Sequence, residues 1–266
     1  MSEKVSLTVN KQSAEEVVPT DLVPLPSEGV VYPVDSPLFG RKAVEIRAMT
    51  ARDEDILTSR ALLKSGRALS VLLKGCIVGL NMDPDLMLSG DRNAALIGIR
   101  ITGYGPEYKI SLICPACGEK VEHEVDLGKL PIKRFPEGVA PVQAGANEFA
   151  FTVPSGKKVT FKLFTGEDER ELVQVVERTR KAGLNEAVIT TRLKLQVLSI
   201  DGERDKSKLA RLVESMPAKD SRALRGYMDR IAPGIELKSD FTCAACGEEG
   251  QEVEVPLGTE FFWPEG

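Results

Sequence analysis

The chain has 266 residues, of which 42% are hydrophobic and 28% are charged, and its formal net charge is −5. This composition is typical of a folded globular protein and excludes a disordered chain, while the acidic balance disfavours a nucleic-acid partner because phosphate contacts dominate that affinity. No stretch reaches the roughly 20 consecutive apolar residues of a membrane helix, and the first twenty residues lack the apolar core of a signal peptide, so we expect no membrane partner and no export.

The first forty residues are polar and rich in turns. Residues 1–18 are polar overall, and we predict a flexible arm that orders only on a partner, because it buries too little apolar area to offset the entropy of ordering. Residues 19–40 are rich in Pro and Gly, which indicates an extended, turn-rich segment. Residues 42–49 then alternate between apolar and polar side chains, as a strand does.

Helical patterns fill most of the remaining chain. An apolar stripe over residues 56–76 is interrupted at Gly66, and residues 91–101 carry a further helical pattern. After a proline-rich linker, the alternation over residues 148–164 predicts a β-hairpin that turns at Ser155 and Gly156. Four more helices are predicted over residues 172–180, 184–198, 206–214 and 219–231.

Two pairs of similar segments indicate an internal duplication. Residues 44–57 resemble residues 159–172 at a constant offset, and in both a strand leads to a Thr N-cap, Thr50 or Thr165, and an acidic first helical turn. Residues 114–128 resemble residues 243–258 in the same order. The alternative is a chance similarity of short capping motifs.

We therefore predict an α+β fold of two duplicated modules, each a small sheet plus helices, joined by a zinc-ribbon-like site of four cysteines. The predicted boundaries are a flexible arm over residues 1–18, a first module over residues 19–130, a linker over residues 131–148 and a second module over residues 149–266.

The strongest motif is a pair of CxxCG sequences. Each forms a tight turn that points two thiolates into one concave site, and two such turns supply the four soft ligands that tetrahedral zinc prefers. We predict one structural zinc ion per chain, held by Cys114, Cys117, Cys243 and Cys246. Two alternatives stay open, namely two free dithiols and two half-sites that other chains complete.

The other reactive residues do not indicate catalysis. Cys76 lies in an apolar helical run, which favours a small buried side chain over a metal ligand. His123, the only histidine, lies on an alternating strand and is expected to be exposed, although it could replace one cysteine as a ligand. With one histidine and no phosphate-binding glycine loop, we expect neither an enzyme nor a small-molecule substrate, and a CxxC redox enzyme lacks the thioredoxin-like context it needs.

Aromatic residues near both ends are candidate anchors for protein partners. Phe261, Phe262 and Trp263 are consecutive and cannot all share one side of a strand. We predict Phe262 and Trp263 as partner-binding residues, with Tyr32 and Phe39 as the next candidates. Alternatively, the C-terminal segment folds back and covers the second module.

Several segments together resemble a known family. The sequences LPSEGVVYP, VEIRAMTARDEDILTS and IRITGYGPEYKISLICPACG, with the closing CxxCG and FFWP, resemble the T-even-type phage baseplate hub family. The resemblance covers most of residues 19–130, and its end reappears at residues 241–264.

The resemblance implies a structural component of a contractile-tail baseplate that binds other phage tail or baseplate proteins. It implies synthesis in the bacterial host cytoplasm and a final place in the virion tail. Two alternatives remain, a cytoplasmic assembly chaperone of the baseplate hub and a zinc-ribbon adaptor that binds nucleic acid.

Overall fold

The structure is a computed structural model that describes residues 18–183, 186–249 and 251–262. The predicted flexible arm, apart from Val18, and the predicted anchor Trp263 lie outside the described residues.

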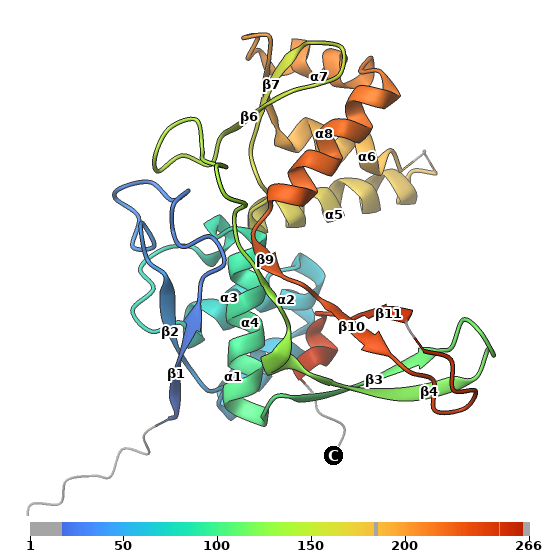
Figure 1. The fold of residues 1–266 in the computed structure, drawn as a ribbon. Helices are drawn as coiled ribbons and strands as arrows, with labels where there is room; N and C mark the ends of the chain where they lie inside the picture. The colour runs from blue at the N-terminus through green and yellow to red at the C-terminus, as the bar shows by residue number, and fades with distance from the viewer. Residues whose placement is uncertain (1–17, 184–185, 250, 263–266) are drawn as a thin grey trace, which may run out of the picture.

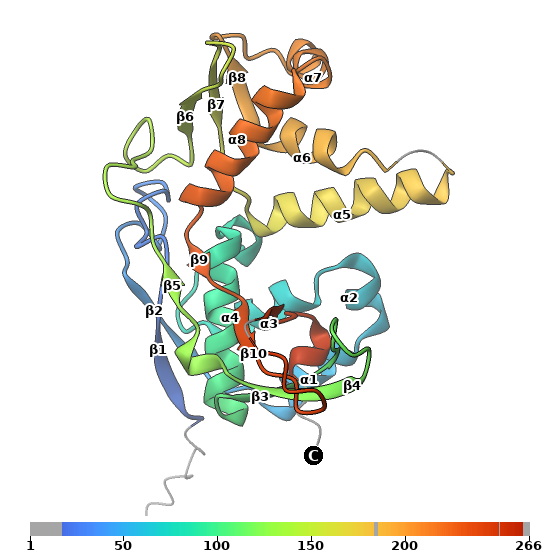
Figure 2. The same ribbon diagram turned by 45° about the vertical axis from the view of Figure 1, so that its right-hand side comes forward.

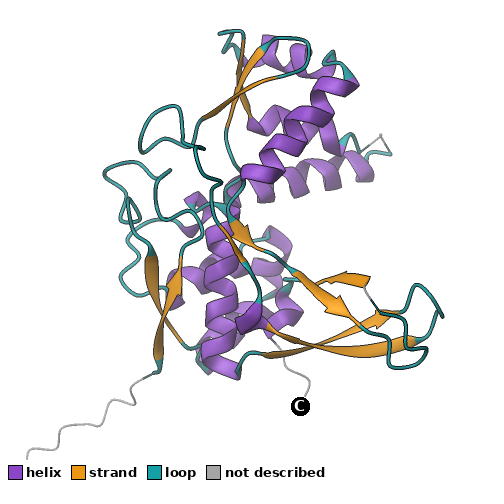
Figure 3. Ribbon diagram, in the orientation of Figure 1, coloured by secondary structure: helices purple, strands orange, loops and turns teal. Residues whose placement is uncertain are grey.

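Helices and short strands together confirm the α+β class (Figure 3). The helices are α1 (Ala51–Thr58), α2 (Arg60–Ser65), α3 (Ala68–Cys76), α4 (Ser89–Tyr104), α5 (Gly166–Lys181), α6 (Val188–Gln196), α7 (Lys206–Glu214) and α8 (Ala218–Ile231), with 3₁₀ turns η1 (Pro84–Leu86), η2 (Leu127–Lys129) and η3 (Thr259–Phe262). The strands are β1 (Thr20–Pro24), β2 (Ala43–Arg47), β3 (Glu107–Ile113), β4 (Lys120–Asp126), β5 (Ile132–Lys133), β6 (Phe149–Thr152), β7 (Lys158–Phe161), β8 (Val197–Ile200), β9 (Gly234–Ile235), β10 (Lys238–Phe241) and β11 (Gln251–Glu254). All the described sheets are small and antiparallel, with the pairings β1-β2, β3-β4, β5-β9, β6-β7-β8 and β10-β11.

Helix α4 is the centre of the lower lobe of the molecule, with β1 and β2 on one side and α1, α2 and α3 close by (Figure 1). The contact between α4 and β1 is so close that a Cβ atom at Gly98 would lie 2.2 Å from the Cγ2 atom of Val23. Glycine is therefore required at this position of the helix. Among the described helices, none combines the length and the apolar character needed to cross a membrane.

The upper lobe combines a three-stranded sheet, β6-β7-β8, with helices α5 to α8, of which α5 lies beneath α6 and away from the sheet (Figure 2). The prediction of one helix over residues 184–198 is wrong at its end, because α6 stops at Gln196 and β8 begins at Val197. Val197 and Ile200 are buried against the neighbouring β7, so sheet pairing outweighs the helical pattern of the sequence there. Strand β1 was likewise missed, since it lies in the segment predicted to be turn-rich.

The two strand–helix units that resemble each other in sequence have the same local structure. The Asp53 carboxylate accepts a hydrogen bond from the Thr50 backbone N–H (2.8 Å) and pairs with Arg47 (2.7 Å) at the start of α1. At the start of α5, Asp168 accepts from the backbone N–H of Thr165 (3.1 Å) and pairs with Lys162 (2.6 Å). Both predicted Thr caps are confirmed.

After α8 the chain returns to the lower lobe. Strand β9 pairs with β5, and the hairpin of β10 and β11 then lies beside the hairpin of β3 and β4 (Figures 1 and 2). The second CxxCG turn therefore lies with the first one rather than with the upper lobe. The predicted module boundaries stay a prediction.

A buried charged cluster joins the two lobes. The Asp85 side chain in η1 is only 3% exposed, and it pairs with Arg92 of α4 (3.1 Å) and with Arg170 of α5. Burial opposes ionisation of Asp85, but hydrogen bonds from Ser70 and Arg170 and the charge of Arg92 outweigh it and lower the pKa of this carboxyl. The Asp85 carboxylate thus compensates two guanidinium groups, that of Arg92 in the lower lobe and that of Arg170 in the upper lobe.

Phe261 and Phe262 lie inside the molecule rather than on its surface. Phe261 and Phe262 are each 1% exposed, and the Phe261 ring packs edge-on against Tyr108 at 4.9 Å. The buried Arg100 of α4 donates from its Nε to the backbone oxygen of Phe261 (3.1 Å). The segment does fold back, but onto α4 and β3, which belong to the predicted first module and not to the second.

The charged cluster generates a prediction for stability. Asp85→Asn is expected to lower the free energy of unfolding by about 3–5 kcal/mol, because it leaves the buried Arg92 uncompensated. The lowered pKa means that the Asp85 carboxylate stabilises the fold above the pKa of the unfolded chain and that this contribution is lost as the pH falls through the folded-state pKa. The difference between wild type and variant, measured by urea denaturation, should therefore shrink at acid pH.

The matched control is Glu177→Gln, which removes the exposed pair between Glu177 and Lys181 and should change stability by less than about 1 kcal/mol. An Asp85→Asn variant as stable as this control would show that the cluster does not hold the lobes together.

Candidate metal centre

Four cysteine sulfurs converge at the end of the two hairpins. All four Sγ atoms of Cys114, Cys117, Cys243 and Cys246 lie within 4.8 Å of one another. The Sγ atoms of Cys114 and Cys246 are 3.9 Å apart, and those of Cys117 and Cys243 are 3.8 Å apart. A tetrahedron with metal–sulfur bonds of about 2.3 Å has edges of about 3.8 Å, so the spacing fits one tetrahedrally bound ion.

The two CxxCG turns have the same backbone geometry. The Cys114 N–H donates to the Glu119 oxygen (2.9 Å), and the Gly118 N–H donates to the Cys114 oxygen (2.8 Å). The second turn repeats both bonds at 2.9 Å, from Cys243 to Glu248 and from Gly247 to Cys243. Gly118 has a φ of 77° and Gly247 a φ of 74°, a left-handed conformation in which a side chain is strained. The glycine after each CxxC pair is therefore part of the site.

Burial and charge at the sulfurs favour a bound cation. Cys114 and Cys243 are 1% exposed, whereas Cys117 and Cys246 are exposed. Backbone N–H groups, first that of Cys246, lower the pKa of Cys243 to about 7. At Cys246 the N–H of Glu248 favours the thiolate, but the surrounding sulfurs, first that of Cys243, raise its pKa to about 12. Four thiolates at this spacing repel one another, and a metal cation removes that repulsion.

The remaining cysteine and the histidine lie outside the sulfur cluster. Cys76 is fully buried, as predicted, and burial raises the pKa of its thiol to about 12. The His123 Nε2 lies 3.1 Å from the Ser239 Oγ, and its ring packs edge-on against Phe241 at 5.4 Å. His123 is therefore half-buried between the two hairpins instead of exposed, and it holds β4 against β10.

Of the predicted partner-binding residues, Tyr32 and Phe262 are buried and Phe39 is exposed. Tyr32 is 4% exposed, and its hydroxyl donates to Asp91 (2.6 Å) and accepts from the Leu88 N–H (3.0 Å). Together with the buried Phe262, Tyr32 is a core residue, and the expectation that these two are surface anchors is corrected. Phe39 is 39% exposed and is available to a partner.

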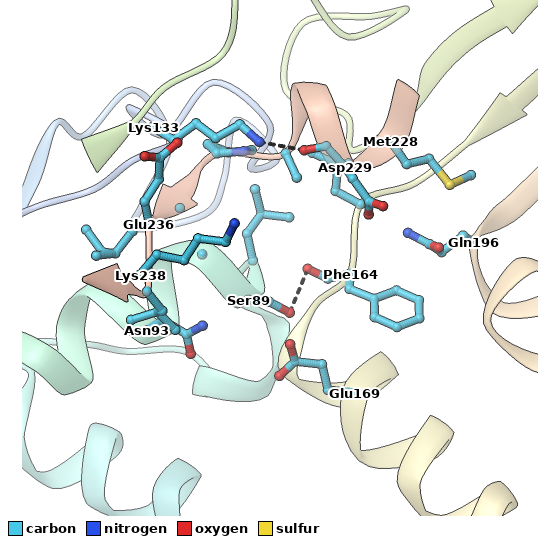
Figure 4. A pocket seen from close by; sticks show the side chains of 18 of the residues that line it. Ser89, Asn93, Lys133, Phe164, Glu169, Gln196, Met228, Asp229, Glu236 and Lys238 are labelled. Atoms are coloured by element: carbon cyan, nitrogen blue, oxygen red, sulfur yellow. Dashed lines mark hydrogen bonds between the residues drawn. The ribbon is translucent and has the colours of Figure 1, made fainter. Parts of the chain in front are cut away.

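A second concave region lies between the two lobes and has a volume of about 500 Å³ (Figure 4). Among its lining residues, Arg192 donates to the Asp229 carboxylate (2.9 Å), and the Lys133 ammonium donates to the Asp229 backbone oxygen (2.5 Å). The Ser89 hydroxyl donates to the Phe164 oxygen (3.2 Å) across the lobe junction. The Lys133 and Ser89 contacts join the lobes, and the lining side chains do not converge on a ligand position as the four sulfurs do.

One family of known proteins matches part of the chain. Residues 31–145 match the family described as T4 bacteriophage base plate protein, which confirms the resemblance to T4-type phage baseplate proteins. The match includes Cys114 and Cys117, and it supports a structural role in the baseplate and a place in the virion tail. It ends before residue 241, so the resemblance of residues 241–264 stays a prediction. Neither the curated proteins nor the solved structures contain a match to the chain.

The sulfur geometry predicts one metal ion per chain. Cobalt(II), added to the reduced protein, is expected to bind with one equivalent and to show the visible absorption of a tetrahedral thiolate site. Cys114→Ser should abolish this spectrum, whereas His123→Gln should retain it, because His123 contacts Ser239 and not the sulfurs. A spectrum that Cys114→Ser leaves unchanged, or one equivalent per two chains, would contradict a site built within one chain.

Proposed function

We propose that this protein is a structural component of a phage contractile-tail baseplate and that it binds other tail proteins through a rigid frame stapled by one zinc ion. The observation that carries the proposal is the meeting of Cys114 and Cys117 with Cys243 and Cys246 in a chain whose residues 31–145 match a base plate family. The zinc ion would fix the two hairpins of the lower lobe, and the Asp85 cluster joins that lobe to the upper one. A frame held at both places suits an architectural protein. Residues 31–145 also contain exposed side chains suited to contact with neighbours.

Zinc is the ion best suited to the site. Thiolate ligands are soft and the spacing is tetrahedral, a combination that zinc accepts without a redox change. Four protein ligands leave no open coordination position for a substrate or an activated water. We therefore assign the ion a structural role and propose that the protein is not an enzyme.

The nucleic-acid adaptor is the weaker alternative. The two hairpins that carry the cysteines, residues 107–126 and 236–254, together contain eleven Asp or Glu residues and three Lys residues. Phosphate groups are repelled by such a surface. The assembly chaperone of the host cytoplasm has the same chemistry as a baseplate component, and only its absence from the finished particle distinguishes it.

We also infer that the frame arose by duplication. The paired charges Arg47–Asp53 and Lys162–Asp168 occupy equivalent positions, and each joins the end of a strand of an antiparallel pair to the first turn of the following helix. A bridge between Ile46 of β2 and Ile77 after α3 corresponds to the pairing of Phe161 in β7 with Val197 in β8. In each half, helices then lead to a hairpin that ends in a CxxCG turn.

An exposed apolar patch is the surface that we propose for a tail partner. Val34 is 74% exposed, Phe39 39% and Val142 60%. A Cβ atom at Gly145 would touch both the Val34 and the Phe39 side chains, so these residues adjoin the loop that follows Val142. All of them lie within the matched residues 31–145. Apolar side chains clustered on a surface are typical of protein interfaces.

Two measurements test this function. Mass spectrometry of purified tails should find the protein at a fixed copy number. Replacement of Val34 and Phe39 together by Asp should reduce incorporation at least tenfold, because charged groups would have to be buried at the interface.

The variant Val173→Asp is the control, since Val173 is 57% exposed on α5 and lies outside the patch, and it should incorporate normally. Metal content should be unchanged in every variant. Absence of the protein from finished tails would assign it to the assembly chaperones, and normal incorporation of the double variant would exclude this patch.

A further inference from the structure

We call the two cysteine hairpins, residues 107–126 and 236–254, the metal arm. A groove lies between strand β3 of the first hairpin and strand β11 of the second. Its volume is about 430 Å³, and its walls are residues 110–113 and 115 on one side and residues 252–256 on the other. Leu112, Ile113 and Val253 make it apolar, and Ile113 is 69% exposed although it is a large aliphatic residue. Such exposure is unfavourable in an isolated chain and is relieved when a partner covers it.

Each of the two strands that border the groove has one edge that pairs with no other strand among the described residues. Strand β3 pairs only with β4, and β11 pairs only with β10, among the residues that the structure describes. An open edge offers backbone N–H and C=O groups to an additional strand, and proteins use this mode to bind extended peptides. The groove therefore fits a β-strand with alternating apolar side chains.

The charge of the metal arm restricts which strand can bind. Glu252 and Glu254 lie in the groove wall, within an arm that contains eleven acidic residues and three lysines. Glu252 pairs with Lys238 (2.6 Å), but both side chains remain more than half exposed. A strand with lysines at its ends and without acidic residues complements this surface.

The chain itself contains a segment with these properties. Residues 4–11, KVSLTVNK, place Val5, Leu7 and Val9 at every second position, with Lys4 and Lys11 at the ends. Five extended residues span roughly 17 Å, which suits the length of a short edge strand.

We propose that residues 4–11 of one copy bind as an added strand in the groove between β3 and β11 of a second copy. Residues 12–17 connect the segment to the described chain, and seven extended peptide units span at most roughly 25 Å. The chain enters at β1, which lies on the side of α4 opposite the metal arm in both views (Figures 1 and 2). This position favours the groove of a neighbouring copy over the chain's own groove. The inference goes beyond the proposed function and does not depend on it, because both the segment and the groove belong to this chain.

A zero-length carbodiimide cross-linker, applied to the full chain, tests the proposal. Equal amounts of natural and ¹⁵N-labelled protein are mixed, treated, digested and analysed by mass spectrometry. The expected products join Lys4 or Lys11 to Glu252 or Glu254, and mixed isotopic pairs show that two copies are joined.

The variant Leu7→Asp should reduce these products more than about tenfold and should speed amide hydrogen exchange in residues 110–113 and 252–255, because it places a charge in the apolar groove. Ser13→Asp adds the same charge outside residues 4–11 and should leave the products and the exchange unchanged. Absence of the products, products within single copies only, or an equal yield from Leu7→Asp would overturn the proposal.

Discussion

The four sulfurs impose the constraint on which the metal arm depends. They join two segments whose paired cysteines, Cys117 and Cys243, are 126 residues apart in the chain. Each hairpin forms only a two-stranded sheet, and an isolated sheet of that size is marginally stable in water. The apolar cluster beside them is small, with Cys114, Phe241 and Cys243 as its buried members among the described residues. In the zinc-bound form that we propose, metal-binding free energy becomes folding free energy and takes the place of a large core.

The packing of the two hairpins against each other also determines where the C-terminal part of the chain lies. Once the second hairpin lies against the first, the chain that follows it is directed back to α4 and β3. There Phe261 packs against Tyr108, and Arg100 donates to the backbone oxygens of Phe261, Gly105 and Glu107 at 3.1, 2.9 and 3.1 Å. A fully buried guanidinium is tolerated because these carbonyl groups satisfy its donors. The last described residues are thus part of the core of the lobe in which the first strands lie.

Residues whose role depends on local chemistry could be predicted from the sequence, and residues whose role depends on distant neighbours could not. The CxxCG turns and the Thr50 and Thr165 caps follow from a few adjacent residues, and the structure has them as predicted. Phe262 and Tyr32 are aromatic residues of the kind that often anchor interfaces, but contacts around α4 bury them. Strand β8 follows a helical pattern and becomes a strand because β7 has a free edge beside it. No signal in one sequence reports such long-range pairing.

The open edges of the metal arm raise the question of how the protein avoids unselective association. Proteins commonly protect an exposed strand edge with charges. Here acidic residues outnumber lysines by eleven to three, so the net negative charge repels a second metal arm and attracts a basic strand. The thiolates of a zinc site add further negative charge to the same arm. With zinc bound as we propose, the four sulfurs hold the two hairpins together, and the net negative charge of the arm favours a basic strand over an acidic one.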